Sequence, residues 1–154
     1  MNQKRALILC LIAVTPLLIC ARTSNAQSDE IKSARKEVIE AVDKLSTIKE
    51  QALPESERVK KEVDLKKSAL DKILTLSKLE TEHLIESVRS IRETGSMFSP
   101  LQEELENTLE GYIGYFTGMR TVLKSIRTID DVQKLASQFK DWRQSTYNPE
   151  TRKA

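Results

Sequence analysis

Apolar side chains recur along most of the chain with the period of a helix. From residue 29 onward they return at intervals of three and four residues, whereas no stretch shows the sustained alternation typical of a β-strand. Pro54, Pro100 and Pro149 divide this region into segments that each keep the helical period, and a proline disfavours helical conformation in the residue before it. The pattern therefore predicts helices at about residues 29–53, 55–92, 100–127 and 130–146.

Each predicted helix has one apolar face. The first has a heptad row formed by Ile31, Val38, Leu45 and Ala52, and a companion row formed by Ala34, Ala41 and Ile48. Because these rows are rich in alanine, a partner helix can approach closely. The second has a long face: Val59, Val63, Leu70, Ile73, Leu74, Leu84, Val88 and Ile91. Ser77 and Thr81 interrupt that face, which predicts a kink or local hydration there. The third has the most regular face: Leu105, Leu109, Tyr112, Phe116, Met119, Leu123 and Ile126.

These helices predict an all-α fold. Amphipathic helices with short connections favour an elongated antiparallel bundle with coiled-coil-like packing, built from three long helices and one shorter C-terminal helix. Two arrangements fit, namely a four-helix bundle from which the second helix protrudes, and a three-helix coiled coil that carries a short fourth helix. We expect residues 27–154 to form one domain, because a chain of this length supports a single core.

The first 26 residues have the parts of a secretory signal peptide. Lys4 and Arg5 form a basic start, an apolar run follows to Cys20, and a polar stretch ends at Ala26. The apolar run is too short to span a bilayer comfortably as a helix. We therefore predict cleavage after Ala26 and export to the periplasm or the exterior. Two alternatives are an uncleaved signal anchor and a lipoprotein modified at Cys20.

Cleavage would change what the composition implies. Both cysteines, Cys10 and Cys20, would leave with the signal segment, so the mature chain would have no disulfide and no thiol nucleophile. The 25 basic residues would fall to 22 while all 23 acidic residues stay, which changes the net charge from +2 to about −1. A domain of that net charge lacks the excess of positive charge that is typical of a nucleic-acid-binding protein.

Residues suited to catalysis or cofactor binding do not form a complete constellation in the sequence. His83 follows Glu80 by three residues, the local pattern of a carboxylate-bridged di-iron site, but that site needs a second histidine and the chain has one. His83 also lies off the apolar face, which favours an exposed or flanking histidine over a weak or dimer-shared metal site. No phosphate-binding glycine loop occurs. We predict no enzyme activity, no cofactor and no metal.

Three glycines form one stripe on the third predicted helix, away from its apolar face: Gly111, Gly114 and Gly118. Each costs about 1 kcal/mol relative to alanine inside a helix. Three glycines on one stripe therefore indicate the close approach of another element. The alternatives are the first or the fourth helix of this chain, a second chain, and a ligand.

Two further groups are candidates for contact surfaces. The second predicted helix has a smaller apolar stripe off its main face: Leu65, Leu76 and Leu79. A helix with two apolar faces contacts two partners, either both within the bundle or one of them external. The fourth predicted helix ends in an aromatic and basic cluster: Trp142, Arg143 and Tyr147. We interpret this cluster as a structural end-cap, with a docking site as the alternative.

Together these features favour an exported, non-enzymatic helical module that acts through protein–protein contacts. Its role would be structural, adaptor-like or chaperone-like, and its partner would be another protein or a second copy of the chain. The alternative function is a small bundle that carries an apolar ligand between its helices. Nucleic acid is not an expected partner, and a membrane is expected only if the signal segment is not cleaved.

Overall fold

The computed structural model of the protein describes residues 29–48, 53–93 and 99–148, and the regular elements in these ranges are all helical. They are α2 (Asp29–Thr47), α3 (Glu55–Glu93), α4 (Ser99–Ser125), α5 (Ile129–Trp142) and a π-helical turn, η3 (Arg143–Tyr147). The prediction of an all-helical fold is confirmed. The signal segment, with its cleavage position at Ala26 and both cysteines, lies outside the described residues.

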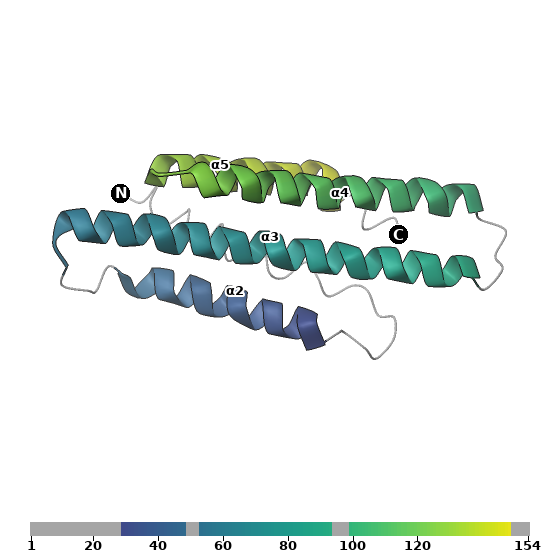
Figure 1. The fold of residues 1–154 in the computed structure, drawn as a ribbon, viewed down its shortest axis with the longest axis horizontal. Coiled ribbons are helices and arrows are strands. Elements are labelled where there is room, and N and C mark those ends of the chain that lie inside the picture. The colour runs from purple at the N-terminus through teal and green to yellow at the C-terminus, as the bar shows by residue number, and fades with distance from the viewer. Residues whose placement is uncertain (1–28, 49–52, 94–98, 149–154) are drawn as a thin grey trace.

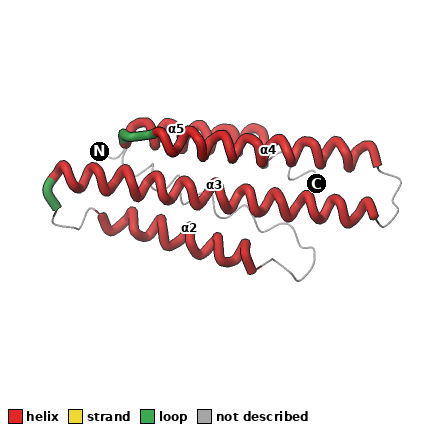
Figure 2. The backbone as a smooth tube through the Cα atoms, in the orientation of Figure 1, coloured by secondary structure: helices red, strands yellow, loops and turns green. Residues whose placement is uncertain are grey.

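The central helix of the molecule is α3. Figure 1 shows α2 along one side of α3 and α4 with α5 along the other, and successive helices run in opposite directions. The helix α3 packs against α2, α4 and α5, and α4 also packs against α5. Figure 2 shows the two short connections that the structure describes, one before α3 and one between α4 and α5. The shape is elongated because α3 and α4 extend together beyond α2 and α5 (Figure 1).

The main core lies between α3, α4 and α5. The predicted seam of α4 faces it, with Leu105 half-buried and the six following members buried. From α5 the core takes the buried Val132, Leu135 and Phe139, and the half-buried Trp142 packs against it. Because these positions follow the helical period without interruption, burial agrees with the sequence pattern here.

The boundaries of the first and fourth predicted helices differ from expectation. The first was expected to reach Leu53, but α2 ends at Thr47 and Leu53 is not helical. Leu53 directly precedes Pro54, whose ring disfavours helical conformation at that place. The fourth begins at Ile129, after Thr128 accepts a hydrogen bond from the backbone N–H of Asp131, and its last turn widens into η3.

The long face predicted for α3 is wrong in one detail. Val59 is 40% exposed, because it lies near the start of α3, outside the core cluster. Ser77 and Thr81 are both buried and α3 continues through them, and a kink or local hydration at this place stays a prediction. The Thr81 hydroxyl donates to the backbone carbonyl of Ser77 at 2.8 Å, which satisfies its donor inside the helix. The side chain of Ile91 lies outside the described residues.

Candidate functional site

The C-terminal cluster is packed into the bundle. Six of the seven aromatic residues of the chain form one group of rings at this place: Tyr112, Tyr115, Phe116, Phe139, Trp142 and Tyr147. Trp142 stacks on Tyr115 with a centroid distance of 4.0 Å. The buried guanidinium of Arg143 lies 5.6 Å from the ring centre of Tyr147. These contacts hold the end of α5 and η3 against α4, as an end-cap would.

Buried polar contacts of α3 lie beside this cluster, one to η3 and one to α2. The hydroxyl of Thr81 already donates to Ser77, so at 3.1 Å it accepts a hydrogen bond from the phenol of Tyr147. At the preceding residue, the carboxylate of Glu80 pairs with Arg35 of α2 at 2.9 Å. Burial raises the pKa of the Tyr147 phenol above its ordinary value of 10.0.

The raised pKa of Tyr147 predicts an alkaline loss of stability. The folded state holds the phenol proton more tightly than the unfolded state, so the contribution is complete below about pH 10 and falls above it, by up to about 1.4 kcal/mol per pH unit. At pH 8, Tyr147→Phe should lower the free energy of unfolding by about 1 kcal/mol through the lost hydrogen bond. Between pH 10 and 11 this deficit should shrink.

Urea unfolding of both proteins from pH 8 to 11 measures this difference. Tyr115→Phe is the matched control, because burial also raises the pKa of Tyr115 but its side chain is only half-buried. Its alkaline change should be smaller. A constant deficit for Tyr147→Phe over the whole range would contradict the prediction.

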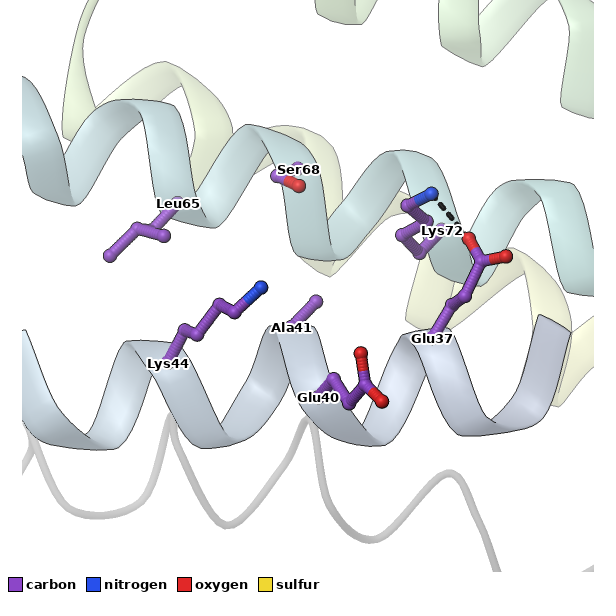
Figure 3. Close-up of a pocket in the computed structure, with 7 residues that line it drawn as sticks. All are labelled: Glu37, Glu40, Ala41, Lys44, Leu65, Ser68 and Lys72. Atoms are coloured by element: carbon purple, nitrogen blue, oxygen red, sulfur yellow. Dashed lines mark hydrogen bonds and ion pairs between the residues drawn. The ribbon is translucent and has the colours of Figure 1, made fainter. Parts of the chain in front are cut away.

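A groove of about 250 Å³ lies between α2 and α3. Figure 3 shows the side chain of Lys44 reaching across it from α2, and the ion pair of Lys72 with Glu37 closing one end. Leu65, one of the predicted off-core leucines, lines the α3 side with Ser68. The groove thus combines an apolar patch with charged walls of both signs.

The leucine stripe of α3 does not form a single exposed patch. Leu65 lies in the groove beside α2, Leu76 packs against the core, and Leu79 is half-buried. The stripe therefore faces partly toward other helices of the same chain, and α3 contacts helices on two sides.

The three glycines lie on the outward side of α4. All are exposed, and a Cβ atom added at Gly111, Gly114 or Gly118 would meet no atom within 4 Å. The expectation that another helix of this chain covers the stripe is therefore wrong for the described residues. The physical reason is that α4 already uses its opposite face to pack on α3 and α5. The alternatives of a second chain and a ligand stay predictions.

Exposed side chains beside these glycines include Thr117 and Thr121, and the exposed carboxylate of Glu110, which directly precedes Gly111, pairs with Arg89 of α3. The hydroxyls of Thr117 and Thr121 donate to backbone carbonyls of their own helix at 2.9 and 3.1 Å. Val122 on the same side is 50% exposed. Arg120 points to α3 instead, where both oxygens of Asp71 accept its hydrogen bonds. We call Gly111, Gly114, Thr117, Gly118, Thr121 and Val122 the α4 outer face.

His83 is half-buried on α3, and its interpretation as an exposed or flanking histidine stays a prediction. Within the described ranges, no three histidine, cysteine, aspartate or glutamate side chains come close enough together to hold a metal ion. The described helices also include none with an apolar stretch long enough to cross a membrane.

Sequence reasoning missed the ion pairs that join the helices. Arg35 and Glu80 are 45 residues apart, and Arg120 and Asp71 are 49 apart. Each charge by itself resembles an ordinary solvated residue. One signal was available, since Glu80 and Thr81 occur within the apolar rows of α3, where polar side chains need partners.

The chain matches no known family model, no curated protein and no solved structure.

Proposed function

We propose that the protein is an exported, non-enzymatic helical module that acts through protein–protein contacts, as a structural, adaptor-like or chaperone-like component. Export is inferred from the basic, apolar and polar parts of residues 1–26, with cleavage after Ala26. Coiled-coil-like packing of the helices is part of this proposal, because heptad rows occur in the sequence.

The α4 outer face is the contact surface in this proposal. The observation that carries it is the open space above Gly111, Gly114 and Gly118, where a Cβ atom would meet no atom of the described residues within 4 Å. Glycines in a helix let a second backbone approach closely. The hydroxyls of Thr117 and Thr121 already donate within their own helix and Val122 is 50% exposed, so these three positions offer few polar groups that a partner would need to desolvate.

The alternative function, a carrier of an apolar ligand, has less support. The groove between α2 and α3 has charged side chains from Glu37, Glu40, Lys44 and Lys72 on its walls. An apolar ligand would have to desolvate these groups without returning hydrogen bonds to them.

Crosslinking in the native host tests the proposed surface. A photoreactive residue at Thr117 should give a defined adduct, and Gly114→Leu together with Gly118→Leu should remove it, because the added side chains keep the partner backbone away. The fold should survive, since both Cβ positions are open. Ser137→Leu introduces a leucine at an exposed site on α5, away from this face, and serves as the control. An adduct that persists in the double variant would overturn the proposal.

A further inference from the structure

The groove between α2 and α3 has fixed walls. Arg35 of α2 pairs with the buried carboxylate of Glu80 on α3 at 2.9 Å. Lys72 of α3 pairs with Glu37 of α2 at one end of the groove. Three apolar residues in this part of the chain are also buried: Ile31, Val38 and Ile48. Because these contacts hold the two helices together, the groove is preformed, and a ligand can enter it without having to order its walls.

Two polar groups of the groove have no partner of their own. The ammonium of Lys44 and the hydroxyl of Ser68 form no hydrogen bond or ion pair within the part of the chain that the structure describes. Lys44 follows Glu40 by four residues, the spacing and order in which the two residue types pair best on a helix. The carboxylate of Glu40 instead lies 3.9 Å from the ammonium of Lys36. Figure 3 shows the charged ends of Glu40 and Lys44 on either side of Ala41.

The groove is small, and part of its lining is apolar. Leu65 is half-buried on the α3 side, and Ala41 is buried on the α2 side. The volume of about 250 Å³ fits a molecule of about ten non-hydrogen atoms. The charged side chains of the lining are two carboxylates and two ammonium groups: Glu37, Glu40, Lys44 and Lys72. A ligand with a single charge would therefore meet a like charge in the groove, whereas a ligand with both charges can pair with both kinds of group.

We propose that the groove is a binding site for a small zwitterion with an aliphatic part, such as a free aliphatic α-amino acid. The ligand's carboxylate accepts hydrogen bonds from the ammonium of Lys44 and the hydroxyl of Ser68. Its ammonium donates to the carboxylate of Glu40, and its aliphatic part covers Leu65. The site lies on the α2 side of α3, whereas the α4 outer face belongs to another helix, so the two proposals can fail independently.

Titration of the full mature chain with three related compounds, followed by NMR, tests the class of ligand. L-leucine has both charges, 4-methylpentanoate lacks the ammonium, and 3-methylbutylamine lacks the carboxylate. L-leucine should shift the resonances of Leu65 and Ser68 with a Kd of about 1 mM or less, and each analogue should bind at least about tenfold more weakly. Unchanged resonances at about 10 mM L-leucine would overturn the proposal. An analogue that binds as tightly as L-leucine would overturn it as well.

Two variants test which side chain recognises which charge. Lys44→Gln should weaken the binding of L-leucine about tenfold and leave that of 3-methylbutylamine unchanged, because only the carboxylate loses a contact. Glu40→Gln should weaken the binding of L-leucine to a similar degree and leave that of 4-methylpentanoate unchanged. Both side chains are exposed, so the fold should survive.

The matched control is Lys32→Gln, which removes a positive charge from an exposed site on α2 outside the groove. It should leave the affinity for all three compounds unchanged. If this control weakened the binding of L-leucine as much as Lys44→Gln, the net charge of α2 would explain the effect and the proposal would fail. Unchanged binding of L-leucine in both Lys44→Gln and Glu40→Gln would also overturn it.

Discussion

Replacing Phe116 by alanine is expected to lower the free energy of unfolding by about 3–5 kcal/mol, the usual cost of removing a buried phenylalanine. The side chain of Phe116 is 0% exposed, and its ring lies between those of Phe139, Trp142 and Tyr147 with centroid distances of 5.5 to 6.1 Å. These neighbours come from α5 and η3, so their rigid placement prevents the cavity from closing. The cost therefore includes the lost transfer free energy and the empty volume.

Urea unfolding followed by circular dichroism measures this effect. Leu101→Ala is the matched control, because Leu101 belongs to the same helix but is 64% exposed. Its effect should stay within about 0.5 kcal/mol. If Phe116→Ala were as mild as this control, the aromatic cluster would not be the centre of the core.

The sequence predicts the fold best where apolar residues recur with a regular helical spacing. In α4 the steps of three and four continue from Leu105 to Ile126, and burial follows them. The end of α2 was less predictable, because the heptad row suggested a helix through Ala52 while Pro54 acts on the residue before it. A period describes the faces of a helix but contains little information about where the helix stops.

The polar contacts of the interior could not be predicted for a different reason. The pairing of Arg35 with Glu80 depends on how far α2 slides along α3, and a sequence pattern does not determine that register. The same holds for the hydrogen bond between Thr81 and Tyr147, which joins residues 66 positions apart. Periodicity could only indicate that Ser77 and Thr81 were unusual on an apolar face.

The glycine stripe shows how a correct observation can lead to a wrong placement. The free-energy cost of three glycines in a helix was a sound reason to expect close approach by another element. The sequence could not show that α4 turns this stripe away from the helices of its own chain. That orientation follows from the competing seam of large apolar residues, which has far more surface to remove from water.

Because the glycines of α4 face away from the other described helices, replacing them with alanine is expected to raise the free energy of unfolding. Gly111, Gly114 and Gly118 lie inside α4, and a Cβ atom at each would enter open space. Alanine at each position should add about 1 kcal/mol, because it reduces the conformational entropy of the unfolded chain without a clash. The triple variant should therefore be about 2–3 kcal/mol more stable than wild type. Thr117→Ala on the same face retains the glycines and should change stability by no more than about 0.5 kcal/mol.

Thermal and urea unfolding of the isolated protein measure the gain in the free energy of unfolding. Crosslinking in the host measures whether the triple variant still contacts the partner. If the α4 outer face contacts a partner backbone, the added methyl groups will hold the two helices apart, so the more stable protein will lose its adduct. Such an opposition between stability and activity is common at functional surfaces. A triple variant that is less stable than wild type would mean that the glycines are needed for the fold itself. The proposal that the α4 outer face contacts a partner would then be overturned.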